Sequence, residues 1–423
     1  MFRSLAIATA LVLSLCQGAA AAIYVKAGRL VDTVNGELRS DQVIVIENDR
    51  ITRVAASGEV EIPADATVID LSRQTVLPGL IDMHTHLTGD HRFHGYESLA
   101  ISVPRETLYG VYNGKKTLLA GFTSVRNVGA GGYSDVALRD AINAGEIDGP
   151  RMRASGPALG ITGGHCDNNL LTAEYADRGA GAADGPWAVR AKVREIIKYG
   201  ADVIKFCATG GVLSKGDSVG GQQYTLEEMQ ALVEEAHQHE RKVAAHAHGA
   251  EGIKAAIIAG VDSIEHSSLI DAEGIRLAEE HGTFLVMDIY NDTYILEHGA
   301  AVGMLPESLE KERQIGQLQR DNFRKAFEGG ARMAFGSDGG VYPHGDNGKQ
   351  FAYMVEYGMT PMEAIQAATV HAAELMGWPE DVGAIEAGRY ADIIAVDGNP
   401  LENVRLLEEV TFVMKGGKVY KSP

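Results

Sequence analysis

Short apolar runs separated by polar turns dominate the N-terminal part of the chain. Residues 43–46 are all Val or Ile, residues 47–50 are polar, and residues 51–54 return to an apolar and β-branched pattern. Two such runs around a polar turn predict a β-hairpin. Residues 67–70 and 75–77 continue the strand-like pattern.

The same pattern returns near the C-terminus. Residues 391–396 and 410–413 are strand-like, and a Gly-Gly pair marks the turn that follows them. We therefore expect both ends of the chain, 23–78 and 381–423, to build one composite β-sandwich domain, with the remaining residues inserted between them.

Between residues 79 and 380, apolar strand candidates alternate with helical stretches. The clearest helix is predicted over 225–239, where Thr225 is suited to cap the N-terminus. Eight strands alternating with helices predict a parallel (β/α)8 TIM barrel, and an open doubly wound sheet is the alternative. The expected strands are 79–86, 122–128, 152–155, 202–206, 243–248, 263–267, 284–289 and 333–337, and further helices are expected over 186–199, 272–281 and 361–376.

The first residues differ in composition from the rest of the chain. Arg3 precedes an apolar run over 5–15, and the alanines at 20–22 offer a small-residue cleavage site. This pattern predicts a signal peptide over 1–22, and therefore an exported protein that is periplasmic or secreted. A membrane anchor is the alternative, although the run is short for a membrane span. A lipoprotein at Cys16 is a weaker alternative, because the preceding residue is a bulky leucine.

The formal net charge of -19 argues against a nucleic-acid partner, which would require a basic face. We expect a small-molecule or short-peptide substrate and no stable membrane association after signal removal, and homo-oligomer formation stays open. Beyond the predicted signal peptide the chain keeps two cysteines, Cys166 and Cys207. Their apolar or Gly-rich surroundings and lack of CxxC spacing favour small core side chains over a disulfide or a structural zinc site.

Two His-X-His patterns end expected barrel strands. In a strand, alternate side chains share a face, so His84 and His86 point the same way, and two neutral imidazoles can bind one divalent cation. His246 and His248 repeat the pattern on the fifth strand. An isolated pattern of this kind is weak evidence, and the alternative is two polar residues at a strand end.

Three further residues occupy matching positions. Lys205 interrupts an apolar strand, where a buried ammonium would be costly. A neutral lysine can instead react with CO2 to form a carbamate that bridges two cations, and a lysine that extends to the barrel rim is the alternative. His266 follows Glu265 on the sixth strand, and Asp338 follows the eighth, although an aspartate before glycine is usually a turn residue.

The common placement of these residues carries more weight than any single motif. All of them lie where an expected barrel strand reaches the face on which barrels carry their active sites. An accidental distribution would scatter them. The sequence therefore predicts a metal site at the mouth of the barrel.

These motifs resemble those of the amidohydrolase superfamily over nearly the whole mature chain. Residues 78–86 are similar to its first-strand signature, and residues 388–393 are similar to its returning β segment. The resemblance implies a two-metal site at which one ion is more buried than the other. It assigns the buried ion to His84, His86 and Asp338, the other to His246 and His266, and the bridge to carboxylated Lys205.

Residues 204–206, 246–249 and 264–266 more narrowly resemble the imidazolonepropionase-related branch. That branch includes prolidase-like and Xaa-Arg/Lys dipeptidases, carboxypeptidase-like enzymes and ochratoxinase. The resemblance implies hydrolysis of an amide bond to a C-terminal amino acid in dipeptides, peptide C-termini or N-acyl amino acids, with ochratoxin A as a further candidate. Two zinc ions are the expected cofactor, with manganese or cobalt as alternatives.

In this interpretation a metal-bridging hydroxide attacks the carbonyl, and Asp338 carries the proton to the leaving amine. His248 is expected to stabilise the oxyanion, with a structural role equally open. His165, in a Gly-rich loop, is a candidate donor to the substrate carbonyl or carboxylate, and Tyr224 is a candidate for a terminal carboxylate. A loop histidine without a ligand and simple packing are their alternatives. His344 is expected at the surface, with a place in the pocket wall as the alternative.

Two other functions remain open. A lactonase or phosphotriesterase-like enzyme would use the same pair of metals on a different bond. A catalytically inactive periplasmic binding protein is the other alternative, and the complete set of expected ligands argues against it.

Overall fold

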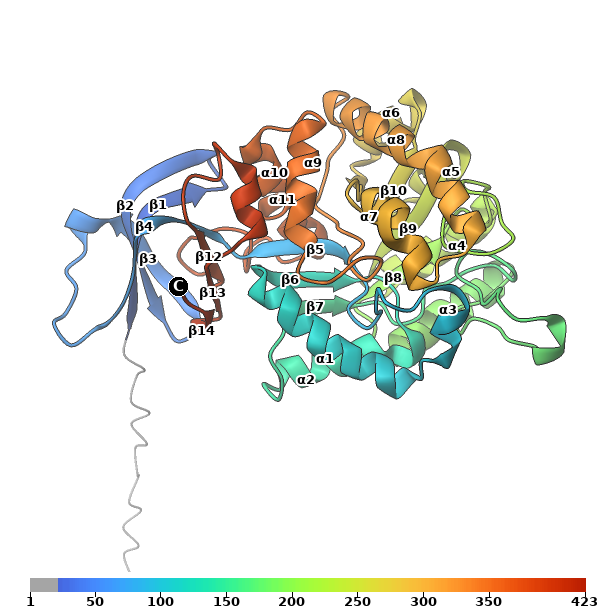
Figure 1. Ribbon diagram of the computed structural model, residues 1–423, viewed down its shortest axis with the longest axis horizontal. Helices are drawn as coiled ribbons and strands as arrows, with labels where there is room; N and C mark the ends of the chain where they lie inside the picture. Colours follow the sequence, from blue (N-terminus) through green and yellow to red (C-terminus); the bar gives the residue numbers. More distant parts are fainter. Residues whose placement is uncertain (1–21) are drawn as a thin grey trace, which may run out of the picture.

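The computed structural model describes residues 22–423, and Figure 1 shows their arrangement. The predicted signal peptide lies outside the described residues except for residue 22, so it stays a prediction. Among the described helices, none has both the length and the apolar content needed to cross a membrane.

Strands from both ends of the chain form one sheet, drawn at the left of Figure 1. Its order is β14-β13-β12-β4-β1-β2-β3. The central strand β4 pairs with β1 along most of its length and with β12 at its end, where Leu77 faces Ile394. The strands are β1 (Ile23–Asp32), β2 (Glu37–Glu47), β3 (Arg50–Ala56), β4 (Thr67–Pro78), β12 (Ile393–Val396), β13 (Phe412–Lys415) and β14 (Lys418–Lys421).

The sheet curls over its own core instead of forming the two separate layers of the expected sandwich. Ile44 on β2 and Phe412 on β13 belong to one apolar cluster, although their strands lie far apart in the sheet order. The Ile51 amide on β3 also donates to the Arg389 carbonyl, which precedes β12. The long strand β4 carries the hydrogen bonding through the bend, so the described strands make a single sheet.

The inserted part has a TIM-barrel-type α/β fold with parallel strands. The assigned strands form two sheets, β5-β6-β7 and β11-β10-β9-β8. The backbone of Leu159 spans the junction by pairing with Lys205 and Cys207 on β8. The strands are β5 (Leu80–Thr85), β6 (Phe122–Asn127), β7 (Arg151–Ala154), β8 (Val203–Cys207), β9 (Lys242–Gly249), β10 (Ser263–Leu269) and β11 (Phe284–Val286).

The expected eighth strand, 333–337, takes the predicted place without becoming a regular strand. The Leu285 amide donates to Arg332, and the Met83 amide donates to Phe335, so the segment lies between β11 and β5. An added Cβ at Gly336 would lie 2.2 Å from Val286 Cγ1, which shows how closely its backbone approaches β11. This close approach and the turn at Asp338, where φ is 56°, leave isolated bridges in place of a continuous ladder.

Helices cover the outside of these strands. The predicted helix 225–239 begins as expected, because Thr225 and Glu228 form a capping box at α4. The helix expected over 361–376 is broken near Thr369, whose backbone is not helical. The helices are α1 (Val103–Leu119), α2 (Ser134–Asn143), α3 (Pro186–Lys198), α4 (Leu226–Gln238), α5 (Ala250–Ala259), α6 (Ala272–His281), α7 (Asn291–His298), α8 (Pro306–Glu328), α9 (Gln350–Glu356), α10 (Pro361–Ala367) and α11 (Val370–Met376).

Phe335 anchors the irregular eighth segment in the core. It is 1% exposed, and its ring centroid lies 5.3 Å from that of Phe122 and 4.7 Å from that of Phe351. We expect Phe335→Ala to lower the free energy of unfolding by about 3–5 kcal/mol, because the cavity forms under a segment with few ladder hydrogen bonds. Denaturant titration measures this loss.

Leu318→Ala is the matched control, because Leu318 is 48% exposed on α8. Its free energy of unfolding should change by no more than about 0.5 kcal/mol. Equal losses in the two variants would contradict the role given to Phe335.

Candidate metal centre

The predicted ligands meet in one cavity of about 510 Å3 at the mouth of the barrel. They come from the carboxyl ends of four strands and from the turn after the eighth segment. Because these ends converge on one face of the barrel, residues far apart in sequence line a common space. The predicted residues in its wall are His84, His86, His165, Lys205, His246, His248, His266 and Asp338.

One group of ligand atoms joins β5 to the turn after the eighth segment. His84, His86 and Asp338 each offer an atom within 4.8 Å of the others. Asp338 Oδ1 lies 3.4 Å from His84 Nε2 and 3.3 Å from His86 Nε2. The structure therefore brings together the three residues that the resemblance assigns to one ion.

A second group contains three histidines from β9 and β10. His246 and His266, the expected pair, are joined by His248, and their ligand atoms also lie within 4.8 Å of one another. A third group, His266, Asp288 and Asp338, connects the first two through shared residues. Asp288 is absent from the predicted set, because nothing in its local sequence distinguishes it.

The chemistry of these residues fits divalent metal ions. His246 Nε2 is buried and has no hydrogen-bond partner, although an imidazole nitrogen is normally paired when it is buried. Several imidazoles with one carboxylate form a nitrogen and oxygen donor set of the kind that zinc prefers. The buried side chain of Lys205 reaches the same cavity from β8.

Carboxylates lie directly behind two of the histidines. Glu265 Oε2 lies 2.9 Å from His84 Nδ1, and its other oxygen accepts from Arg126 at 2.8 Å. Asp288 Oδ1 lies 2.8 Å from His266 Nδ1. Such partners orient metal-binding imidazoles and are needed for tight metal binding. Neither carboxylate belongs to the set of site residues predicted from the sequence.

The protonation states suit cation binding. Burial and the nearby Lys205 lower the pKa of His84 to about 3, which leaves its imidazole neutral at neutral pH. Burial opposes ionisation of Asp338, but His84 and His86 outweigh it and lower the pKa of this carboxyl. Burial also lowers the pKa of Lys205 to about 8, which makes the neutral amine accessible.

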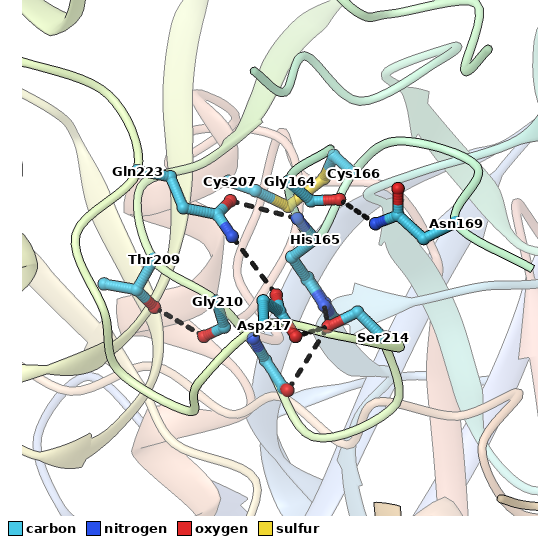
Figure 2. The surroundings of a disulfide bond; sticks show 11 residues. Gly164, His165, Cys166, Asn169, Cys207, Thr209, Gly210, Ser214, Asp217 and Gln223 are labelled. Carbon is cyan, nitrogen blue, oxygen red and sulfur yellow. Dashed lines mark hydrogen bonds between the residues drawn. A yellow bond between two sulfur atoms is a disulfide. The ribbon is translucent and has the colours of Figure 1, made fainter. Parts of the chain in front are cut away.

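A disulfide joins Cys166 to Cys207 in the cavity wall, as Figure 2 shows. The expectation that the two cysteines are separate core side chains is therefore wrong. Their sequence separation of 41 residues conceals the contact, which arises because the loop after β7 folds back over β8. The adjacent His165 stacks on His246 with ring centroids 4.1 Å apart.

Two other predicted placements are wrong. The hydroxyl of Tyr224 donates to the Ala183 carbonyl at 3.0 Å, and the side chain is 1% exposed and lies outside the described cavity wall. Packing therefore explains Tyr224 better than carboxylate binding. His344 is buried instead of lying at the surface, and its Nε2 is 3.2 Å from the carbonyl of His86.

Carboxyl groups outside the predicted ligand set also line the cavity. Glu106 and Glu312 each have a buried oxygen without a hydrogen-bond partner. Burial, with help from Asp292, raises the pKa of Glu312 to about 8. Among the described residues of the wall, Lys205 is the only lysine or arginine. This part of the wall therefore offers groups that can pair with N–H donors.

Comparison with known proteins places the chain among hydrolases. The sequence profile of the Amidohydrolase family matches residues 75–420. Ochratoxinase of Aspergillus niger is 35% identical over 413 residues, which cover 92% of this chain and 85% of that protein.

Two solved structures are similar over nearly their whole length. A Xaa-Pro dipeptidase with methionine bound in its active site has a TM-score of 0.89 and 39% identity, covering 95% of this chain and 100% of its own. A prolidase complexed with N-methylphosphonate-L-proline has a TM-score of 0.87 and 32% identity, covering 95% and 100%.

The contact between Asp288 and His266 gives a testable prediction. We expect Asp288→Asn to weaken zinc binding by about 10–100-fold, because the amide no longer fixes the ring as the carboxylate does. Competition with a chromophoric chelator measures the affinity.

Asp262→Asn is a matched control, because it alters a similar contact, 2.9 Å from His237 Nε2, away from the cavity. Zinc affinity should stay unchanged in this control. Equal zinc affinity of the Asp288→Asn variant and the unmodified protein would contradict the orienting role.

Proposed function

The chain belongs to the amidohydrolase family and is a hydrolase of amide bonds, and from this premise we propose that it cleaves the bond to a C-terminal amino acid with two metal ions. The observation that carries this proposal is the convergence of two ligand groups, linked by His266 and Asp338, in one cavity. Nearby ligand groups of this kind are the arrangement needed for two ions to act together.

We assign one ion to His84, His86 and Asp338 and the other to His246 and His266. A carboxylated Lys205 would bridge them, and its lowered pKa supports carboxylation because only the neutral amine reacts with CO2. Zinc is the proposed metal. Bound there, two divalent cations would acidify a water molecule and polarise the scissile carbonyl.

The protein's own groups then move the proton and hold the substrate. Asp338 is ionised and lies at the junction of the ligand groups, so its Oδ2, which accepts from Asn291 at 3.3 Å, can also accept the water proton and pass it to the leaving amine. His248 is oriented by Ser268, whose Oγ lies 2.7 Å from its Nδ1. We propose that the other nitrogen of His248 faces the oxyanion.

The substrate is proposed to be a dipeptide or a similar amide with an amino acid on the leaving side. The similar dipeptidase binds methionine and the similar prolidase binds a proline derivative, which supports an amino-acid subsite. The unpartnered oxygens of Glu106 and Glu312 can accept N–H groups of a peptide. Ochratoxin A stays a second substrate to test, because of the similarity to ochratoxinase.

The disulfide supports the proposal that the enzyme is exported, to the periplasm or beyond the cell. Disulfides persist in oxidising compartments and are rare in the cytosol. Export, zinc as the metal and assembly into a homo-oligomer remain predictions from the sequence.

A library of dipeptides and N-acyl amino acids tests the proposed reaction. The zinc-loaded enzyme should release free amino acids, detected by amine derivatisation. We expect Lys205→Ala and Asp338→Asn each to lower kcat by about 100-fold or more, because one removes a bridging ligand and the other the proton carrier.

Leu318→Ala is the matched control and should keep the unmodified rate. Unchanged turnover in both site variants would contradict the mechanism. No cleavage across the whole library would instead contradict the substrate class.

The lowered pKa of Lys205 predicts the pH dependence of metal loading. Its neutral fraction rises with pH through about 8, so at constant dissolved CO2 zinc uptake should increase from about pH 6.5 to about pH 8.5. Metal content per chain, measured by mass spectrometry after gel filtration, reports the uptake.

Lys205→Ala separates this effect from protonation of the histidines. Its zinc uptake should not respond to CO2 at either pH. An unmodified protein that is equally insensitive to CO2 would contradict carboxylation of Lys205.

A further inference from the structure

We propose that the Cys166–Cys207 disulfide is a positioning element of the substrate cavity, which fixes the loop carrying His165 against the strand carrying Lys205. The inference rests on the proposed function, because it gives the disulfide a part in substrate binding. A disulfide far from a site would be explained by stabilisation alone. The contacts around the Cys166–Cys207 disulfide indicate that it also positions a residue of the cavity.

Both cysteines adjoin residues of the site. Cys207 follows Lys205 by two positions on β8, so the two side chains share the strand face that lines the cavity. Cys166 directly follows His165, and the disulfide holds the Cα atoms of the two cysteines 5.8 Å apart. The loop is also tied to β8 near its start, where the Leu159 amide donates to the Lys205 carbonyl at 2.8 Å.

A chain of polar groups holds His165 from its other side, as Figure 2 shows. His165 Nδ1 lies 2.7 Å from Ser214 Oγ, which donates to Asp217 Oδ1 at 2.6 Å. Lys311 donates to the same carboxylate oxygen at 2.8 Å. The imidazole is thus linked to the disulfide through its backbone and to α8 through this chain.

The faces of the ring are also confined. A Cβ added to Gly211 would lie 2.3–2.7 Å from three atoms of the His165 ring, so the ring packs directly on bare backbone. The ring also stacks on His246. Movement of the loop would therefore displace the imidazole from a close-fitting position beside a metal ligand.

The polar chain fixes the tautomer of His165 as well. An ionised carboxylate only accepts hydrogen bonds, so Ser214 gives its single proton to Asp217 and accepts one from His165 Nδ1. In the neutral ring, Nε2 is then an acceptor. His165 therefore offers the cavity an acceptor for a substrate N–H group, in contrast to the donor role expected from the sequence.

The test replaces both cysteines, because a lone Cys207 thiolate beside Lys205 would be a new metal ligand. With the best dipeptide from the library, zinc-loaded C166A/C207A should show a KM about tenfold higher or more and a kcat within about threefold of the unmodified enzyme. Zinc content should be equal in the two proteins. A KM equal to that of the unmodified enzyme would overturn the proposal.

A double-mutant cycle decides whether the disulfide acts through His165. In a His165→Ala background, removal of the disulfide should change KM by less than about twofold, because the group that it positions is already gone. Ser214→Ala, which cuts the polar chain and leaves the disulfide intact, should raise KM in the same direction. If the effects of the two changes on KM were fully additive, the disulfide would act only as a stabilising crosslink, and the proposal would be overturned.

Val25→Ala is the matched control for stability, because Val25 is fully buried in the terminal sheet. It should lower the melting temperature without changing KM. A KM that rises with loss of stability in this control would overturn the proposal.

A measurement without substrate separates this inference from the proposed function. The 15N chemical shifts of the His165 ring, assigned with His165→Ala, should report the Nδ1–H tautomer in the unmodified protein and a mixture in C166A/C207A. Identical shifts would overturn the positioning role, whereas changed shifts without any turnover would contradict only the proposed function.

Discussion

An ion pair inside the barrel fixes the geometry on which the whole site depends. Arg126 on β6 is 2% exposed and donates to the Met83 carbonyl on β5 at 2.7 Å and to Glu265 on β10 at 2.8 Å. Glu265 in turn lies 2.9 Å from His84. A buried ion pair is tolerated only when its hydrogen bonds are well satisfied, and its disruption leaves a costly unpaired charge. One network therefore connects three strands and places a carboxylate beside the ring of a proposed ligand.

A second buried carboxylate gives the eighth segment its position. Asp82 accepts from the amides of His84 and Ser337, both at 3.1 Å. His84 is itself a proposed ligand, and Ser337 directly precedes the proposed ligand Asp338. Residues 333–337 lack a continuous ladder of backbone hydrogen bonds, so these side-chain contacts hold the segment in place where regular strand pairing is missing. The two halves of the first ligand group are thus held together by charge and hydrogen bonding inside the barrel.

Much of the site follows from local sequence pattern. A two-residue spacing at a strand end fixes the common face of His84 and His86, and the same holds for His246 and His248. The alternation of apolar strands and helices then predicts that these ends meet. The family resemblance predicted from the motifs is confirmed by the family match and by the similarity to ochratoxinase and dipeptidase.

The remaining parts depend on contacts that the local pattern does not contain. Asp288 matters because its strand end adjoins that of His266, and the disulfide forms because a loop folds back across β8. The sequence near Tyr224 also does not reveal that its hydroxyl points inward and donates to the Ala183 carbonyl. The sequence likewise does not predict that the terminal strands form one curled sheet, because this depends on β4 pairing with strands from both ends of the chain.

The shared sheet at the chain ends has a consequence for biosynthesis. β4 continues through Gly79 into β5, which carries His84 and ends just before His86, while β12 pairs with β4 from the opposite end of the sequence. Until the C-terminal strands join the sheet, part of the edge of β4 stays unpaired and the sheet that leads into β5 is incomplete. Such distant pairings form late and slowly. A partly folded chain would therefore have β5 attached to an incomplete sheet with an exposed edge, where it could aggregate, until the C-terminal strands pair.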